Sequence, residues 1–366
     1  MQLELKNVSQ QVGQEMHLSD ICLTLEAGSL NILLGPTLSG KTSLMRLMAG
    51  LDKPTSGTIT QDGQNIIGVP VQKRNVAMVY QQFINYPNLT VYENIASPLR
   101  IAGTPADKRD KIVHRVAELL KLTDMMKRHP EELSGGQQQR TALARALAKG
   151  ADLVLLDEPL ANLDYKLREE LREELPKIFV ETGSIFVYAT TEPSEALLLG
   201  GKTATLHQGT ISQFGPTVEV FRTPNDLITA QTFSDPPLNL LPVLKSQSTL
   251  SCNGSVTIPI TDSRLTDLAD GPYTIAIRPH HLSLTNVDER SIGIKATVVI
   301  TEITGSESYI HVDIEGVRWV LLATGIHSFD IGMAIEIFLN PDRIYLFRED
   351  STLAATPKRS NYRDRN

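Results

Sequence analysis

The chain has 366 residues and a formal net charge of -7, a size sufficient for two or three domains with cores of their own. Proteins that bind nucleic acid usually carry a basic domain or stripe, so the acidic balance gives no reason to expect nucleic acid as a partner. No apolar run approaches the roughly 18 residues of a membrane-spanning helix. The first residues, Met1 to Lys6, alternate like a strand instead of forming a secretory signal, and Cys22 and Cys252 fit no metal-binding spacing. We therefore expect a soluble, cytoplasmic chain with free thiols.

A phosphate-binding sequence follows an apolar run, Leu30 to Leu34, that is short enough for a buried strand. Residues 35–43 begin with the pattern G-x-x-x-x-G-K-[ST] of a P-loop. After it, Leu44, Leu47 and Met48 recur at helical spacing. Strand, loop and helix in this order are the context that the pattern requires, so the sequence predicts a polyphosphate site here.

The residue types of this loop suit a polyphosphate. Glycines let the backbone approach closely, and backbone N–H groups of the loop and of the first helical turn point at the phosphates. We expect Lys41 to reach the β- and γ-phosphates and the Thr42 hydroxyl to bind Mg²⁺. The predicted phosphate-binding residues are Gly35, Pro36, Thr37, Leu38, Ser39, Gly40, Lys41, Thr42 and Ser43.

Strands and helices alternate through residues 1–235, which predicts an α/β domain with a mostly parallel sheet. Residues 83–150 have a helical pattern and are predicted to form a helical subdomain. The most apolar strand ends in Asp157 and Glu158, which could be an ordinary exit to solvent. After a P-loop, Asp157 is instead expected to hold Mg²⁺, and Glu158 to orient the attacking water. The predicted strands cover residues 3–8, 21–25, 30–34, 75–80, 153–156 and 185–189, and residues 203–211 are predicted to form two short strands around Gln208-Gly209.

The composition changes near Asp235-Pro236-Pro237. Beyond this point, short β-branched runs separated by Gly- and Asp-rich turns predict an all-β, OB-like barrel over residues 236–348. The polar residues 349–366 are expected to form a disordered tail. Runs that favour strands lie at 273–277, 294–301, 309–314, 319–322 and 334–339.

A five-residue motif, which precedes the strand that ends in Asp157 and Glu158, resembles the signature of a known family. Leu133-Ser134-Gly135-Gly136-Gln137, taken alone, is a capped helix start with exposed backbone N–H groups. It resembles the LSGGQ signature of ABC transporters, and Gln81 and Ala161-Asn162-Leu163-Asp164 resemble the Q-loop and the D-loop. Residues 235–242 and 277–282 are similar to the hinge and the β regulatory domain of maltose-type importer ATPases. The resemblance covers nearly the whole chain.

In that family two nucleotide domains face each other, and each ATP with its Mg²⁺ lies between the P-loop of one subunit and the signature of the other. The resemblance therefore implies that the signature residues bind the nucleotide of a second ATPase subunit. It also implies that Gln81 contacts Mg²⁺ and the attacking water. The signature residues concerned are Ser134, Gly135, Gly136 and Gln137.

The same resemblance implies membrane partners. Two integral membrane permease subunits would dock near the Q-loop, on a surface that includes Phe83, Tyr86 and Pro87, although these could instead be core residues. A periplasmic solute-binding protein would take part indirectly. The chain is then expected at the cytoplasmic face of the cell membrane.

Three positions depart from the family pattern. Thr191 occupies the place of the switch histidine, which touches the γ-phosphate and helps the catalytic water, and threonine lacks a titratable imidazole. Val12 occupies about the place of an aromatic that stacks on adenine. Leu38 stands where many relatives have glycine, at a backbone cost if the position requires positive φ. We infer an impaired P-loop site beside an intact signature, hence a pair of different ATPase subunits; a homodimer in which Glu158 suffices is the alternative.

The function predicted is the energising ATPase subunit of an ABC importer of a small polar solute, a sugar or polyol. Residues 35–50 resemble one of the two ATPase subunits of a glycerol importer, which would fit a heterodimer. A nucleotide-dependent regulatory or structural subunit with little hydrolysis of its own is the alternative. A soluble ABC protein acting on DNA or ribosomes is disfavoured by the β domain and the acidic balance.

Overall fold

The computed structural model describes residues 1–161, 163, 165–252 and 256–358, which fall into two compact units, Met1–Val220 and Phe221–Asn366. The division comes before the composition change at Asp235-Pro236-Pro237, where we expected it. The physical reason lies in Arg278, which donates hydrogen bonds to the backbone oxygens of Phe233 at 2.9 Å and Phe221 at 3.1 Å. These bonds tie residues from Phe221 onward to the β unit.

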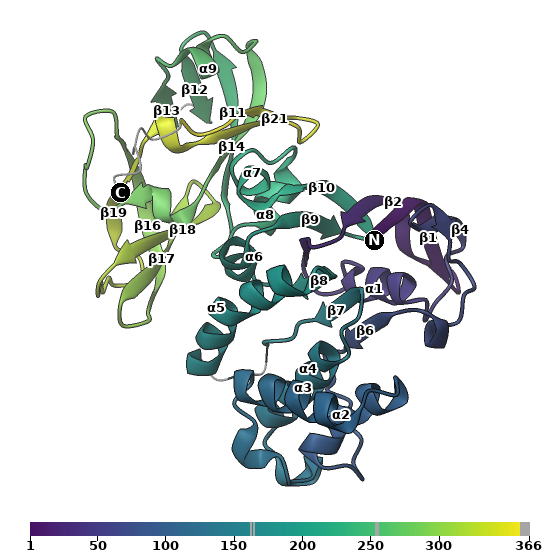
Figure 1. Ribbon diagram of the computed structural model, residues 1–366. Helices are drawn as coiled ribbons and strands as arrows, with labels where there is room; N and C mark the ends of the chain where they lie inside the picture. The colour runs from purple at the N-terminus through teal and green to yellow at the C-terminus, as the bar shows by residue number, and fades with distance from the viewer. Residues whose placement is uncertain (162, 164, 253–255, 359–366) are drawn as a thin grey trace. The chain divides into compact units, whose positions relative to one another are not determined.

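A six-stranded sheet forms the centre of the first unit (Figure 1). Its order is β10-β9-β3-β8-β7-β6, and the pairs from β9 to β6 are parallel, as predicted, while β10 pairs antiparallel with β9. Strands β7 and β8 are buried along their whole length, which explains their continuous apolar sequences. The strands are β3 (Leu30–Leu34), β6 (Val76–Val79), β7 (Leu153–Asp157), β8 (Ile185–Thr190), β9 (Lys202–His207) and β10 (Thr210–Pro216).

The first two strand-like runs belong to a separate antiparallel sheet of order β2-β1-β4-β5. Helix α1 packs between the two sheets, because Leu5 of β1, Leu44 of α1 and Leu155 of β7 share one buried cluster. The outer sheet consists of β1 (Gln2–Val12), β2 (Glu15–Glu26), β4 (Ser56–Gln61) and β5 (Gln64–Asn65).

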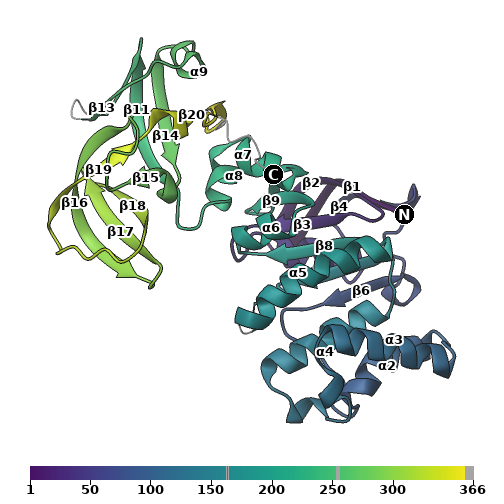
Figure 2. The same cartoon turned by 60° about the vertical axis from the view of Figure 1, so that its left-hand side comes forward.

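Helices α2, α3 and α4 gather at one end of this unit, below strand β6 in both views (Figure 1, Figure 2). They lie within residues 83–150, for which a helical subdomain is predicted. Thr90 caps α2 with a reciprocal pair of hydrogen bonds to Glu93. The helices are α1 (Lys41–Ala49), α2 (Val91–Ile101), α3 (Ala106–Leu119), α4 (Gly135–Ala148), α5 (Tyr165–Thr182), α6 (Pro193–Leu199), α7 (Thr217–Arg222), α8 (Leu227–Thr232) and α9 (Ser263–Thr266), with 3-10 turns at Val71–Lys73, Thr123–Met125, Pro130–Glu132, Pro279–His281 and Pro341–Arg343.

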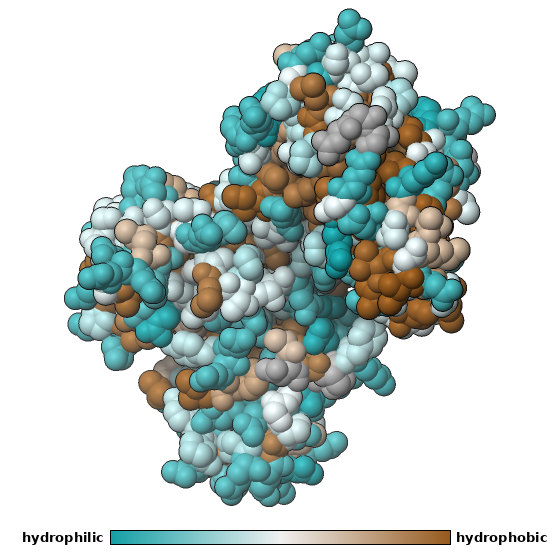
Figure 3. Space-filling model, turned by 180° about the vertical axis from the view of Figure 1, so that it is seen from behind, coloured by the Kyte–Doolittle hydropathy of each residue, from teal (hydrophilic) through white to brown (hydrophobic). Residues whose placement is uncertain are grey.

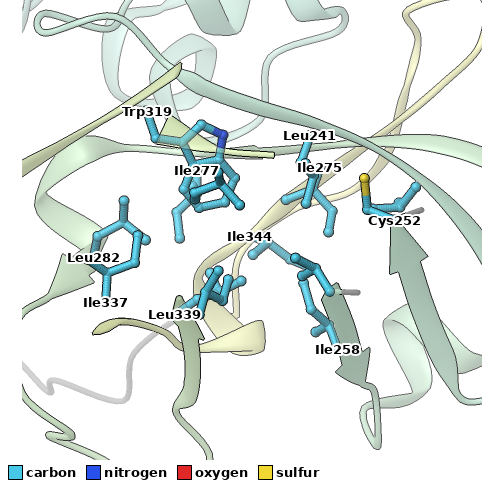
Figure 4. Close-up of a cluster of buried hydrophobic side chains, with 14 of the residues drawn as sticks. Leu241, Cys252, Ile258, Ile275, Ile277, Leu282, Trp319, Ile337, Leu339 and Ile344 are labelled. Carbon is cyan, nitrogen blue, oxygen red and sulfur yellow. The ribbon is translucent and has the colours of Figure 1, made fainter. Parts of the chain in front are cut away.

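The second unit contains two antiparallel sheets over one core, as predicted for an OB-like β domain. Figure 4 shows this core, in which Ile275 and Leu241 of one sheet meet Ile337 and Trp319 of the other. The Trp319 indole donates a hydrogen bond to Leu240 O at 2.9 Å, so its one polar atom is satisfied. The sheets have the orders β13-β12-β11-β14-β20-β21 and β15-β19-β16-β17-β18. The strands are β11 (Asn239–Ser246), β12 (Thr249–Cys252), β13 (Val256–Pro259), β14 (Gly271–Ile277), β15 (Leu282–Ser283), β16 (Ile292–Ile303), β17 (Glu307–Ile314), β18 (Val317–Thr324), β19 (Ala334–Leu339), β20 (Tyr345–Arg348) and β21 (Leu353–Ala355).

The prediction of a disordered tail from residue 349 was wrong for its first part. Leu353–Ala355 forms strand β21 on the edge of β20, with Ala355 opposite Leu346. Further on, Lys358 donates its backbone N–H to Asp342 O at 2.7 Å and forms an ion pair with Asp262. Polar residues on both sides concealed this strand, which is only three residues long. Residues 359–366 lie outside the described part of the chain.

Exposed apolar side chains occur on the β unit, where Figure 3 shows brown surface between hydrophilic regions. Ile300 lies on β16, while Ile331 and Met333 precede β19. A backbone hydrogen bond from Val298 N to Met333 O brings the two segments side by side. Neighbouring exposed apolar residues of this kind suit contact with another protein.

Candidate nucleotide site

Four predicted segments meet at one edge of the parallel sheet, where the strands end. Leu34 pairs with Thr190, and Asp157 pairs with Ala189. The loops that follow β3, β7 and β8 therefore begin next to one another, and β6 adds Gln81 two residues after its last residue, Val79. The carboxyl edge of an open parallel sheet is the usual place of a ligand site in α/β proteins.

The P-loop joins β3 to α1 through closely approaching backbone. A Cβ atom at Gly35 would lie 2.3 Å from Leu206 O, so no other residue fits there. Gly40 has φ 104° and precedes α1, whose first turn presents N–H groups to the cavity. Leu38 has φ 67°, so the positive φ considered from the sequence is present, and its side chain is 96% exposed.

A cavity of about 500 Å³ opens over this loop, within the range of small-ligand sites. Ser39 Oγ is buried and has no hydrogen-bond partner within the described part of the chain, so it is available to a phosphate oxygen. Gly35 and Pro36 are not lining residues, but their carbonyl oxygens accept hydrogen bonds from Lys41. The cavity is lined by Glu15, Met16, His17, Thr37, Leu38, Ser39, Gly40, Lys41, Thr42, Ser43, Gln81, Glu158, Gln208 and Gly209.

Lys41 is the cation of the site. Its Nζ donates hydrogen bonds to Gly35 O at 2.7 Å and Pro36 O at 2.9 Å. Burial lowers the pKa of Lys41, and the charges of Glu158 and Asp157 oppose that shift. A polyphosphate would supply the negative charge that this buried ammonium group favours.

Thr42 and Asp157, both predicted to bind Mg²⁺, are in contact. Thr42 Oγ1 donates a hydrogen bond to Asp157 Oδ2 at 2.7 Å. Burial raises the pKa of Asp157, while the Thr42 hydrogen bond and the Lys41 charge lower it. A hydroxyl, a carboxylate and the amide oxygen of Gln81 are the hard oxygen ligands that Mg²⁺ prefers, so this donor set fits the ion.

Glu158 faces Gln81 across the cavity, with Gln81 Nε2 donating to Glu158 Oε2 at 2.9 Å. Burial raises the pKa of Glu158, and Lys41 opposes the shift. The residue has φ 47°, a strained conformation of the kind found at functional sites. Glu158 N donates to Ala189 O at 3.0 Å, which fixes this turn to the neighbouring strand β8. A carboxylate with a raised pKa beside a phosphate site is suited to polarising water.

The signature begins helix α4. Ser134 is its N-cap and forms a capping box with Gln137, whose side-chain oxygen accepts from Ser134 N at 2.9 Å. A Cβ atom at Gly135 would meet nothing within 4 Å, so this first turn is open to a ligand. Neither these two residues nor Gly135 and Gly136 line the P-loop cavity. The signature is thus a separate capped helix start, which does not line the P-loop cavity.

Two predicted site residues lie away from the cavity. Val12 ends β1 and is 50% exposed, and it is not a lining residue. Thr191 is exposed after β8 and is not a lining residue either. The adjacent Glu192 forms ion pairs with Arg168 at 3.3 Å and Arg172 at 3.0 Å.

The structure adds residues that sequence reasoning missed. Glu15, Met16 and His17 of β2, together with Gln208 and Gly209 between β9 and β10, line the cavity. Their proximity depends on the pairing of segments far apart in the chain: Ser19 N donates to Gly209 O at 2.8 Å. No local sequence pattern predicts that contact between β2 and the turn at Gly209.

The predicted D-loop is only partly described, since Asn162 and Asp164 lie outside the described residues. Ala161 O and Leu163 O accept hydrogen bonds from Arg168 at 3.2 and 3.5 Å. Arg168 thereby connects this loop with Glu192 after β8.

A second cavity, of about 550 Å³, lies between β6, α2 and α4. Tyr86 lines it and is exposed, and the Arg145 guanidinium lies 4.9 Å from the centre of the Tyr86 ring. Pro87 is also exposed and Phe83 is half-buried, and neither lines the cavity. Of the three residues predicted to meet the permeases, Tyr86 is thus the one built into a groove.

Comparisons with known proteins agree with this geometry. The ABC transporter family matches residues 18–161, and the TOBE domain family matches residues 275–347. The chain is 33% identical over 361 residues to the trehalose/maltose import ATP-binding protein MalK of Thermococcus litoralis, covering 94% of this chain and 97% of the relative. It is 32% identical over 360 residues to the maltose/maltodextrin import ATP-binding protein MalK of Escherichia coli K12, covering 96% of each.

A solved ATP-binding cassette is also similar to this chain. The dimeric post-hydrolysis structure of the ATP-binding cassette MJ0796 with ADP and Pi has a TM-score of 0.55 and 29% sequence identity, covering 59% of this chain and 98% of that one. Among the described residues, no helix combines the length and apolar composition needed to cross a membrane.

The P-loop edge and the capped signature helix define an ATPase of the ABC class, which uses ATP and Mg²⁺. The chain belongs to the maltose-type import ATP-binding proteins of that class, and it is an ATP-binding subunit of an ABC importer.

Proposed function

We propose that this chain energises the import of a small polar solute, a sugar or polyol, with glycerol as the specific candidate. The solute class is supported by relatives named as trehalose/maltose and maltose/maltodextrin import proteins. ATP binding closes the chain against a second ATPase subunit, and this closure drives two integral membrane permease subunits. The permeases receive solute from a periplasmic binding protein, and the chain is peripheral at the cytoplasmic face of the membrane.

The two ATPase subunits differ in this proposal. The observation that carries it is the position of Thr191, which replaces the switch histidine and lies exposed beside a Glu192 already paired with two arginines. The P-loop site retains Lys41, Asp157 and Glu158, so it binds ATP and hydrolyses it slowly. The signature from Ser134 to Gln137 completes the faster site of the partner. A homodimer that relies on Glu158 alone is the competing arrangement.

The permeases dock at the groove beside α2 in this proposal, on the surface of Phe83, Tyr86 and Pro87. The groove is supported as the docking site by its volume and by the exposed Tyr86 ring against Arg145. Tyr86→Ala is expected to reduce solute-coupled ATPase activity of the assembled complex and to leave ATP binding by the chain unchanged. Equal coupling in wild type and variant would refute this docking site.

Reconstitution tests the whole proposal. The chain, a second ATPase and the permeases would be assembled in proteoliposomes, and ATP-driven uptake of radiolabelled glycerol and maltose would be measured with the binding protein present. Uptake of one of these solutes supports the importer, and a complex that hydrolyses ATP without importing sugars or polyols contradicts it. ATP turnover by the isolated chain, compared with the chain plus the second ATPase, separates a slow subunit from a regulatory subunit without hydrolysis. Recovery of the chain with nucleic acid, without permeases, would refute the transporter function.

A further inference from the structure

The nucleotide base needs a surface in the P-loop cavity that Val12 does not provide. Val12 is the last residue of β1, faces Glu15 in the register and is not a lining residue. From the same hairpin, the cavity is lined by Glu15, Met16 and His17 of β2. Of these three side chains, only His17 carries a planar ring.

A β-bulge positions His17. Gln10 pairs with Leu18 in the register. The next residue, Gln11, pairs with Met16, so His17 is an extra residue on β2 that has no opposite partner on β1. Bulges are enriched next to active sites because they re-aim a side chain relative to the regular strand.

The backbone of His17 is held against the P-loop helix. A Cβ atom at Gly40 would lie 3.1 Å from His17 O, and one at Gly209 would lie 2.5 Å from it. Both glycines have positive φ, so other residues would be strained there as well as crowded. Two unrelated segments thus fix the place of His17 beside the start of α1, while its side chain remains 37% exposed at the cavity.

We propose that the imidazole of His17 stacks on the nucleotide base, with the apolar side chains of Met16 and Leu38 beside it. A heteroaromatic ring offers the π-face that valine lacks, and stacking on such rings depends little on which base is present. Met16 is 55% exposed, and a thioether packs favourably against the edge of an aromatic ring. The inference rests on the proposal that ATP occupies this cavity.

Binding titrations of the full-length chain test the inference with two ligands, ATP and inorganic tripolyphosphate. His17→Ala is expected to weaken ATP binding about tenfold, since a stacked base contributes about that much affinity, and to leave tripolyphosphate binding unchanged. His17→Phe keeps a ring without hydrogen-bonding atoms and is expected to bind ATP within about twofold of wild type. His17→Gln keeps a polar side chain without a ring and is expected to weaken ATP binding as His17→Ala does. His114→Ala, at an exposed histidine on α3, is the matched control and changes neither ligand.

Several outcomes would overturn the inference. Unchanged ATP affinity in His17→Ala would show that the ring does not contact the base. An equal loss of affinity for ATP and tripolyphosphate would indicate a structural or phosphate-binding role for His17. Retained affinity in His17→Gln with loss in His17→Phe would indicate a hydrogen bond in place of stacking. A selective loss of ATP affinity in Val12→Ala would place the base on β1. Lys41→Ala tests separately whether ATP occupies the P-loop cavity at all. If ATP affinity survives this change, the nucleotide lies outside the cavity, and the proposal on which the inference rests fails.

Discussion

Leu38 occupies a backbone conformation that glycine adopts without strain. Its φ of 67° lies in the left-handed region, and its side chain is 96% exposed, so little packing offsets the strain. Leu38→Gly should raise the free energy of unfolding by about 0.5 kcal/mol, the strain relief less the added backbone entropy of the unfolded chain. Urea denaturation of both proteins measures this change in the free energy of unfolding. Leu38→Ala retains the strain and should show no gain; an equal gain in both variants would assign the effect to the side chain.

The proposed slow hydrolysis at the P-loop site is assigned to Thr191, because threonine supplies no imidazole. Thr191→His should increase single-turnover hydrolysis at this site at least about tenfold, a modest part of what a positioned acid–base group contributes. The measurement uses the assembled ATPase pair with the partner's own glutamate inactivated. Thr191→Val should remain as slow as wild type. A histidine variant that is no faster would show that another feature of the site limits hydrolysis.

Helix α5 connects the loops that follow β7 and β8. Arg168 donates to Ala161 O at 3.2 Å and forms an ion pair with Glu192 at 3.3 Å. Arg168→Ala should loosen both loops, so that amide hydrogens of residues 160, 161, 163 and 190–192 exchange about five- to tenfold faster, consistent with the loss of roughly 1 kcal/mol.

The exposed Lys166 of the same helix provides the control for Arg168. Lys166→Ala should leave hydrogen exchange in these loops unchanged. If exchange becomes faster only in the loop that follows β7, Arg168 is not needed to hold the loop that follows β8. Arg172, which also forms an ion pair with Glu192 at 3.0 Å, then holds that second loop.

Most elements of the first unit could be predicted because their signals are local. Leu153 to Leu156 is continuously apolar because β7 is buried on both faces, and the P-loop pattern needs only consecutive residues. Pairings between distant segments had no such signal. The bulge at His17 depends on the register with β1, and strand β21 depends on the exposed edge of β20.

The same distinction applies to the site. Lys41, Thr42, Asp157 and Glu158 could be predicted as neighbours from consecutive residues, because the P-loop follows β3 and the two acids lie at the end of β7, and both strands end at one sheet edge. Val12 is predicted to bind the base by counting residues back from the P-loop. Counting does not detect the bulge in the hairpin, at which His17 lines the cavity. The other cavity residues, Gln208 and Gly209, arrive through tertiary contact with β2.

At the scale of the molecule, the β unit should lose stability in acid. Burial lowers the pKa of His281 to about 3, with the charges of His280, Arg343 and Arg278 adding to the shift, and its Nδ1 is buried without a partner in the described part of the chain. An unfolded histidine has a pKa of about 6.5, so the unfolded state binds more protons between these two values. Stability is therefore fully present above pH 6.5 and falls as the pH decreases, with a slope of at most about 1.4 kcal/mol per pH unit from this residue.

Chemical denaturation of the full chain at several pH values, followed by the fluorescence of Trp319 in the β unit, measures this dependence. Trp319 is the single tryptophan of the chain, so the signal reports on that unit. His281→Gln should flatten the curve between pH 6.5 and 4.5. An unchanged slope in this variant would assign the acid sensitivity to other groups.

The proposed asymmetry of the two ATPase subunits is tested by paired substitutions of Glu158 and the equivalent glutamate of the second ATPase. Glu158→Gln in this chain and the equivalent change in the second ATPase would be introduced separately, and solute-stimulated ATPase activity of the reconstituted importer would be measured. If the subunits differ, Glu158→Gln leaves a substantial part of the activity, while the partner's substitution lowers it by about a hundredfold or more. Equal abolition of activity by the two substitutions would contradict the proposed asymmetry.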